Sequence, residues 1–156
     1  MAVLDLADLP QAVAPMTPLV GLDLGAKTIG VAVSDIGRVI ASPLELIRKV
    51  QFTKDAHTLF ALMQTRGAAG LVIGLPVNMD GTEGPRAQSC RAFARNILRL
   101  RPDLAIAFWD ERLSSAAVNR MLIDEADLTR ARRGQLVDKA AAAYILQGAL
   151  DRLNAG

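Results

Sequence analysis

The chain has 156 residues, a formal net charge of +2 at pH 7, and 51% hydrophobic residues. This length suits one domain with a self-sufficient core, and the small net charge does not identify a class of partner. The single cysteine, Cys90, and the single histidine, His57, exclude a disulfide within the chain and a zinc site of cysteine and histidine ligands.

Residues 1–18 are expected to form a flexible tail that precedes one domain over residues 19–156. The tail carries Pro10, Pro15 and Pro18 and lacks lysine and arginine, a composition that fits neither a secretory signal nor a transit peptide. No apolar run reaches the length of about 20 residues that a membrane span requires. We therefore expect a soluble, cytoplasmic protein that does not bind membranes.

The segment 19–35 predicts two adjacent strands joined by a tight turn, because apolar residues flank Gly25 and Gly30. Asp23 lies in the first of these strands. Taking an isolated carboxylate out of water costs several kcal/mol, so a buried one is usually hydrogen-bonded, paired or bound to a metal. Asp23 is therefore either a metal ligand on the first strand of an enzyme or a residue that caps the turn.

Further along the chain, strands begin to alternate with helices. Residues 39–47 predict a third strand, and Pro43 within it favours an edge of the sheet or a strand start. The apolar spacing over 54–66 predicts a helix, and the apolar run 70–75 predicts a central strand covered on both faces. Turn-forming residues at 77–85 predict a functional loop at the carboxyl end of that strand.

The second half of the chain continues the alternation. Residues 86–100 predict an amphipathic helix, and residues 104–109 predict another strand. Ser114 is expected to cap the next helix, residues 129–134 to form a basic loop, and residues 135–153 to form an alanine-rich helix that packs on the sheet. This order predicts an α/β domain with a mixed sheet whose first three strands are antiparallel.

Basic side chains gather in this second half. Residues 86–139 contain eleven lysines and arginines, ten of them arginine, against seven aspartates and glutamates. Arginine suits bidentate contacts to phosphate, although a modest excess of arginine also occurs on ordinary solvated surfaces. The pattern is therefore compatible with nucleic-acid binding and does not establish it.

Two further acidic positions share the unusual surroundings of Asp23. Asp110 and Glu111 directly follow a predicted strand, and Asp138 lies close to the packing face of the last helix. Taken singly, Asp138 can interact with the helix dipole, and Asp110 or Glu111 can pair with Arg112. Taken together, acids at two strand ends and on a closing helix can converge, because sites in α/β folds gather at the carboxyl ends of strands.

Converging carboxylates call for a cation. Two like charges about 4 Å apart repel by roughly 4 kcal/mol at an effective dielectric near 20. Oxygen ligands without histidine or thiolate select Mg²⁺ or Mn²⁺, and two such ions can assist an in-line phosphoryl displacement. The pattern predicts metal-dependent hydrolysis of phosphodiester bonds, and it leaves the choice between Asp110 and Glu111 open.

Four sequence motifs follow one another along the chain: GLDLGAKTIGVAVSD at 21–35, VIGLPVNMDGTE at 72–83, DERLS at 110–114 and VDKAAA at 137–142. In this order they closely resemble the YqgF family, also called the RuvX family, of Holliday junction resolvases and pre-16S rRNA nucleases. The similarity covers nearly everything from Leu19 to about Leu153. It implies an RNase H-like fold, a five-stranded mixed sheet with helices on both faces. It also implies a metal-dependent nuclease that trims the 5′ end of the bacterial 16S rRNA precursor.

The family pattern also implies roles for individual residues. Asp23, Glu111 and Asp138 are implied to be the catalytic acids that bind Mg²⁺ or Mn²⁺, which selects Glu111 over Asp110. The residues implied to contact the phosphate backbone are Lys27, Asn78, Arg112, Arg130, Arg132 and Arg133. Thr28 departs from the pattern, because many family members have arginine there. The expected partners are precursor rRNA or branched DNA, and the ribosome.

Three alternative functions are compatible with parts of this pattern. The first is a DNA endonuclease of the Holliday junction resolvase type. The second is a noncatalytic nucleic-acid-binding module for ribosome assembly. The third is an ATP site like that of sugar kinases, actin or Hsp70, which also uses an Asp-x-Gly motif. Those proteins need two domains to enclose the nucleotide, whereas this chain has the length of one.

Overall fold

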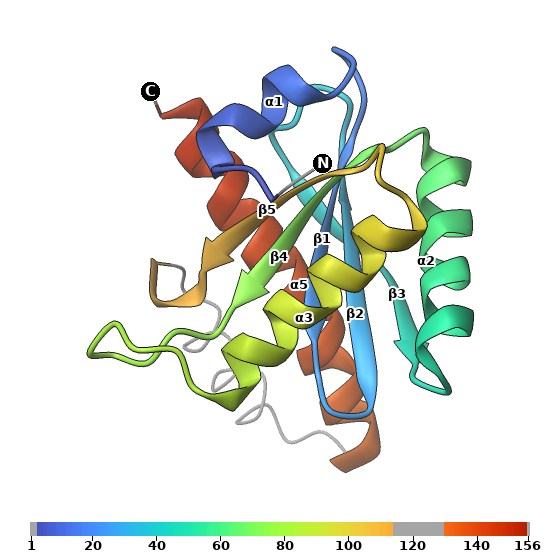
Figure 1. Ribbon diagram of the computed structural model, residues 1–156, viewed down its shortest axis with the longest axis vertical. Coiled ribbons are helices and arrows are strands. Elements are labelled where there is room, and N and C mark those ends of the chain that lie inside the picture. The colour runs from blue at the N-terminus through green and yellow to red at the C-terminus, as the bar shows by residue number, and fades with distance from the viewer. Residues whose placement is uncertain (1–2, 114–129, 156) are drawn as a thin grey trace.

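The protein is built on a five-stranded sheet with helices on both faces, as the computed structural model shows (Figure 1). The structure describes residues 3–113 and 130–155, and for residues 130–139 it describes the backbone alone. The strands are β1 (Leu19–Leu24), β2 (Thr28–Ser34), β3 (Ala41–Arg48), β4 (Gly70–Leu75) and β5 (Ala105–Asp110), in the spatial order β3-β2-β1-β4-β5. β1, β2 and β3 are antiparallel, and β4 and β5 run parallel to β1. The predicted mixed sheet is confirmed.

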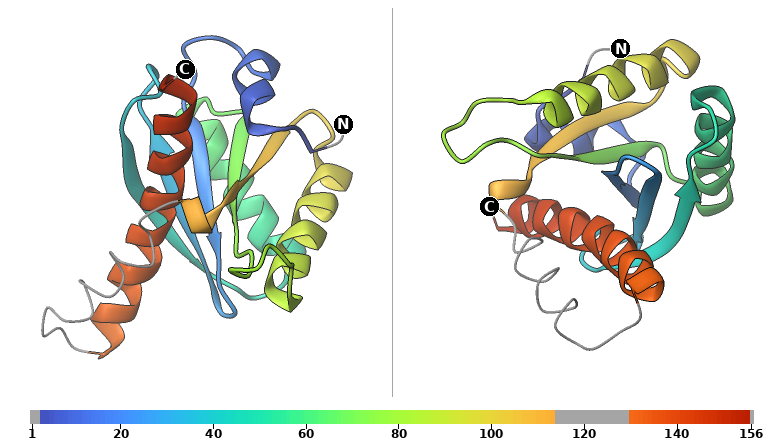
Figure 2. Two further views of the ribbon diagram at one scale, coloured as in Figure 1. Left: turned by 90° about the vertical axis from the view of Figure 1, so that its left-hand side faces the viewer. Right: turned by 90° about the horizontal axis from the view of Figure 1, so that it is seen from below.

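Helices cover the two faces of the sheet in separate layers. α2 (Phe52–Arg66) and α3 (Pro85–Leu100) lie on one face, and α5 (Arg130–Asn154) lies on the other (Figure 2). Alternation along the strands divides the apolar side chains between the two layers. Leu22 and Ile73 pack toward α2 and α3, whereas Leu19 and Val72 pack toward α5.

Three glycines let α5 approach the sheet closely. A Cβ on Gly21 of β1 would stand 2.6 Å from the Cβ of Leu146, and a Cβ on Gly74 of β4 would stand 2.5 Å from Cδ1 of Ile145. The third glycine, Gly148, belongs to the helix: a Cβ on it would stand 2.9 Å from Cζ2 of Trp109 on β5. Side chains at these positions would therefore hold the helix away from the strands.

The prediction of a flexible tail over residues 1–18 is wrong for the part of the tail that folds onto the domain. This part includes a 3₁₀ turn (Leu6–Asp8) and the short helix α1 (Leu9–Ala12). Leu9 is fully buried against the α5 layer, and the Leu4 amide donates to the Ile106 carbonyl at 2.8 Å. The apolar side chains of the segment complete the core beside β5, which holds the segment in place.

The second half of the chain differs from the prediction at the start of its last helix. α5 begins at Arg130, so residues 130–134 are helical and do not form the predicted basic loop. Arginine and alanine are strong helix formers, and one glycine within them costs only about 1 kcal/mol. The helix predicted to start at Ser114 lies outside the described residues. No helix in the described part of the chain is long and apolar enough to span a membrane.

Candidate active site

Asp23 is a buried carboxylate on the central strand of the sheet. Its exposed fraction is 6%, and in the ladder it lies opposite Gly30 of β2. A backbone hydrogen bond from Gly25 to Thr28, 2.9 Å long, closes the following turn. Asp23 lies two residues beyond Gly21, whose Cβ direction points at α5, so strand alternation turns Asp23 toward the same helix.

Glu111 approaches the same end of the sheet from the strand on the other side of β4. It opens a 3₁₀ turn (Glu111–Leu113) that follows β5, and its carboxyl carbon lies 3.4 Å from the Cβ position of Gly74. The register pairs Ile73 with Leu22, so the next residues, Gly74 and Asp23, lie side by side on β4 and β1. The two carboxylates therefore flank Gly74.

The negative charges of both carboxylates act on one buried thiol, that of Cys90. Cys90 on α3 is 3% exposed. Burial, first, and the negative charges of Glu111 and Asp23 together raise the pKa of the Cys90 thiol to about 11, although Arg86 and Lys49 oppose the shift. Cys90 is therefore protonated at neutral pH and is not a thiolate ligand. The donors that remain at this end of the sheet are carboxylate oxygens, which suit Mg²⁺ or Mn²⁺.

Asp138 lies on α5 in the part of the helix that points toward the Asp23 end of β1. It precedes Ala142 by one turn, and the carbonyl oxygen of Ala142 is 3.2 Å from the Cβ position of Gly21. The other end of α5 lies beside the start of β3, where Gln147 accepts from the Ala41 amide at 2.9 Å. The side chain of Asp138 is outside the described part. Among the side chains that are described, no group of three or more metal-ligating residues occurs.

Asp110 and Glu111 have different surroundings, which the sequence alone left undecided. The Arg112 guanidinium donates from Nη2 and Nε to the Asp110 carboxylate at 2.7 and 3.1 Å, and the Arg112 amide donates to it at 2.9 Å. The side-chain hydrogen bonds from Arg112 lower the pKa of Asp110. Asp110 thus holds Arg112 in place, whereas the Glu111 carboxylate lies against Gly74.

The loop between β4 and α3 is ordered by its own hydrogen bonds and touches Arg112. Asn78 donates from its side-chain amide to Thr82 Oγ1 at 3.0 Å, and the backbone amides of Asn78 and Gly81 close the loop. Nη1 of Arg112 lies 3.4 Å from the carbonyl oxygens of Asn78 and Met79. Two predicted substrate contacts, Asn78 and Arg112, therefore lie together beside Glu111.

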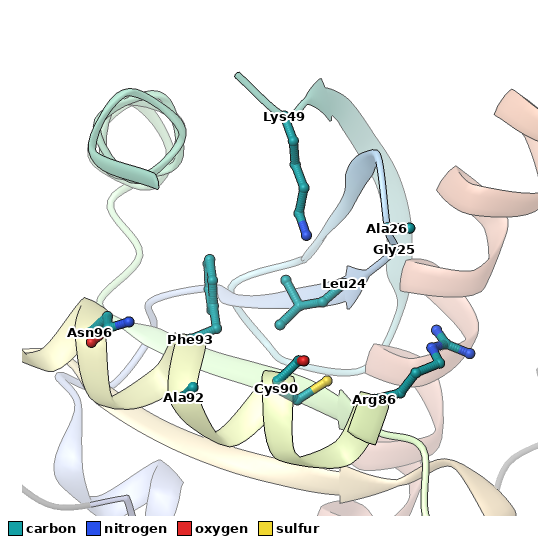
Figure 3. A pocket seen from close by; sticks show the side chains of 10 residues that line it. Leu24, Gly25, Ala26, Lys49, Arg86, Cys90, Ala92, Phe93 and Asn96 are labelled. Carbon is teal, nitrogen blue, oxygen red and sulfur yellow. The ribbon is translucent and has the colours of Figure 1, made fainter. Parts of the chain in front are cut away.

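A pocket of about 540 Å³ opens at the same end of the sheet, on the α3 face, opposite to the face toward which Asp23 points (Figure 3). The turn after β1, the end of β3 and one face of α3 form its walls. The side chains that matter most for its chemistry are those of Leu24, Lys49, Arg86, Cys90, Phe93 and Asn96.

The family model for RuvX, described as Holliday junction resolvase, matches residues 17–152 of the chain. The chain belongs to the RuvX family. Its RuvX relatives match it over almost their full length. A protein of Phenylobacterium zucineum named "Putative pre-16S rRNA nuclease" is 73% identical over 153 residues, which is 98% of either chain. Proteins of the same name from Caulobacter vibrioides and Rhodospirillum rubrum are 63% and 59% identical, covering 98% and 99% of this chain and 98% and 95% of theirs.

A solved structure places the RuvX chain in a known fold. T. thermophilus RuvC in complex with Holliday junction substrate superposes with a TM-score of 0.50 at 13% sequence identity, covering 87% of this chain and 94% of that chain. At this identity the likeness shows the fold alone. The fold predicted from the motifs, an RNase H-like α/β domain, is confirmed.

The remaining predicted contacts of the RuvX chain lie apart from the carboxylates or outside the described side chains. Lys27 is exposed in the turn after β1, where its carbonyl accepts from the Lys49 amide at 2.9 Å. Arg130, Arg132 and Arg133 belong to the first turns of α5, and their side chains are not described. Lys49 and Arg86 were missed as candidate binding residues, because no local pattern signals that the end of β3 and the start of α3 line the same pocket.

Proposed function

We propose that this chain is a metal-dependent nuclease that hydrolyses phosphodiester bonds in the precursor of 16S rRNA. The observation that supports the proposal most directly is the position of Asp23 and Glu111 on either side of Gly74, at the carboxyl end of the parallel strands. Membership of the RuvX family and the names of its relatives supply the reaction and the substrate. Such an enzyme acts in the bacterial cytoplasm, on precursor rRNA within or beside the assembling ribosome.

In this proposal Asp23, Glu111 and Asp138 hold Mg²⁺ or Mn²⁺. When bound there, two such ions supply an activated water and neutralise the charge that develops on the leaving oxygen. The absence of a side chain on Gly74 leaves room for the Glu111 carboxylate. Asp110 orients Arg112, so that the guanidinium stays beside the metal-binding acids.

In the same proposal, basic and polar side chains hold the phosphate backbone. Lys27 is exposed, so its ammonium group can contact a phosphate of the substrate. Arg112 adds positive charge beside Glu111, and Asn78 shapes the loop that Arg112 touches. The family pattern adds Arg130, Arg132 and Arg133, at the start of α5, to the proposed phosphate contacts. Each of these contacts is expected to weaken with salt, because binding releases the counterions of the phosphates.

The test is cleavage of a 16S rRNA precursor and of a four-way DNA junction by the purified protein, with Mn²⁺ and with a chelator. Wild type should cut the precursor only with the metal, and Asp23→Asn and Glu111→Gln should abolish cutting. Asp8→Asn and Glu45→Gln remove the same functional groups from exposed positions and should cut like wild type. Cleavage of the junction alone would assign the chain to DNA resolution. RNA binding without any metal-dependent cleavage would make it a noncatalytic assembly module.

A further inference from the structure

The pocket on the α3 face has the size and position of a binding site for part of a substrate. Its volume of about 540 Å³ falls within the range of roughly 300–1,000 Å³ typical of ligand pockets. Leu24, in its wall, directly follows Asp23, and Cys90, also in its wall, feels the charge of both Asp23 and Glu111. A molecule in this pocket would therefore lie at the same end of the sheet as Asp23 and Glu111, on the α3 face, whereas the two carboxylates face α5.

The charge of the pocket suits a phosphate group. Lys49 and Arg86 are the charged members of its described lining, and both carry a positive charge. Figure 3 shows the Lys49 side chain pointing into the space between Leu24 and Phe93. Both cations have exposed side chains, so binding a phosphate would not require either to leave a buried partner.

The apolar wall of the pocket suits a nucleobase. Phe93 packs against the core of the domain, and Phe52 meets it in a T-shaped contact with 5.6 Å between ring centroids and an interplanar angle of 81°. The ring is therefore held in position before any ligand arrives. Aromatic rings of this kind stack on bases of any sequence, and Asn96 adds an amide at the same wall that can hydrogen-bond a base edge.

We propose that this pocket holds one unpaired nucleotide of the substrate strand, adjacent to the segment that is cleaved, with Lys49 on its phosphate and Phe93 stacked on its base. Arg86, which points toward α5, contacts the strand between the pocket and the carboxylates (Figure 3). The inference rests on the proposed nuclease function, since it takes nucleic acid as the substrate. A base that stacks on Phe93 has left its partner strand. The pocket therefore makes the protein select single-stranded RNA at the cleavage site.

The test measures binding of a short fluorescein-labelled single-stranded RNA by anisotropy in EDTA, so that binding is separated from cleavage. Phe93→Leu should weaken binding at least about fivefold, because stacking contributes about 1–3 kcal/mol per base and 1 kcal/mol corresponds to a factor of about five. Lys49→Gln should weaken binding and reduce the slope of log K against log salt by about 0.7, the value for one phosphate contact on a single strand. Phe60→Leu and Lys54→Gln are matched controls outside the pocket on α2 and should bind like wild type.

A second arm uses the same RNA annealed into a perfect duplex, to which Phe93→Leu and wild type should bind equally. Equal binding of the single strand by wild type, Phe93→Leu and Lys49→Gln would overturn the inference, as would a failure of wild type to bind it. The proposed nuclease function is judged separately by Mn²⁺-dependent cleavage. If the pocket variants bind RNA like wild type while wild type cleaves, only the proposed nucleotide pocket is refuted. If the pocket variants bind more weakly but wild type does not cleave, only the proposed nuclease function is refuted.

Discussion

The carboxyl carbon of Glu111 lies 3.4 Å from the point at which a Cβ on Gly74 would stand. The absence of a side chain at this position on β4 lets a residue that follows β5 reach toward β1, where Asp23 lies. The same missing side chain admits Ile145 of α5, whose Cδ1 is 2.5 Å from that point. One glycine therefore serves both the candidate metal site and the packing of the helix.

Gly74→Ala should impair both functions of this glycine. The added methyl group would overlap Ile145, and overpacking of this kind costs about 1–3 kcal/mol. It would also stand in van der Waals contact with the Glu111 carboxyl carbon, restrict the carboxylate and reduce cleavage. Adding Ile145→Val removes Cδ1 and should restore much of the free energy of unfolding measured in urea, but it should leave cleavage low. Recovery of cleavage together with stability would mean that Gly74 acts through packing alone.

Asp23→Asn should uncouple stability from the metal. Without metal, the variant should unfold at the same temperature as wild type or higher, because it removes one of two neighbouring negative charges. Adding Mn²⁺ should raise the Tm of wild type, since a ligand that binds only the folded state stabilises it, and should leave the variant unchanged. Differential scanning calorimetry checks both. An equal Mn²⁺ response in the two proteins would exclude Asp23 as a ligand.

Arg112→Lys should lower kcat/KM of cleavage with little loss of stability. Lysine cannot reproduce the fork of hydrogen bonds to Asp110 or the reach to the Asn78 carbonyl, and an ion pair this exposed contributes at most about 1 kcal/mol. Arg101→Lys is the matched control, because Arg101 makes the same kind of pair with Asp103 far from the carboxylates. Equal kcat/KM values for the two variants would contradict a role for Arg112 at the site.

Cys90 should stay protonated in the folded protein up to strongly alkaline pH. Its pKa of about 11 when folded lies above its unfolded value near 8.5, so the folded state keeps its proton where the unfolded state loses it. This contribution to stability is complete below about pH 8.5 and is lost as pH rises through about 11. Thiolate absorbance at alkaline pH measures the folded titration directly. A folded midpoint near 8.5 would show that the thiol is not shielded.

Leu9→Ala should destabilise the domain by about 2–5 kcal/mol, as other large-to-small core substitutions do. Leu9 is fully buried, although it lies in the segment predicted from sequence to be a tail. Met16→Ala, at a position that is 72% exposed, should change the free energy of unfolding by less than about 0.5 kcal/mol. Urea denaturation compares the two, and equal midpoints would mean that the N-terminal segment does not contribute to the core.

Local patterns are sufficient to predict the sheet and the burial of Asp23, one of the candidate site residues. Apolar alternation located β1, and with it the anomalous carboxylate Asp23, because burial and period are both encoded in neighbouring residues. The three prolines of residues 1–18 favour an irregular tail, whereas Pro10 occupies the first turn of α1, where proline is tolerated. The burial of α1 depends on β5, which is distant in sequence.

Tertiary contacts decided what the sequence left open. Asp110 and Glu111 are adjacent, and only the position of Arg112 on one side and of Gly74 on the other distinguishes them. Lys49 could not be identified from the sequence, because it lines the pocket together with residues of α3 that are distant from it in the chain. Gly134 ends the predicted basic loop over residues 129–134, whereas in the structure it lies within α5.

The three close approaches at Gly21, Gly74 and Gly148 fall on three different strands, β1, β4 and β5. Three separate points of contact prevent α5 from sliding along the sheet and from rotating about its own axis. The contact of Ala142 with Gly21, one helical turn beyond Asp138, thus fixes the position of the backbone at Asp138 without a bound ion or polynucleotide.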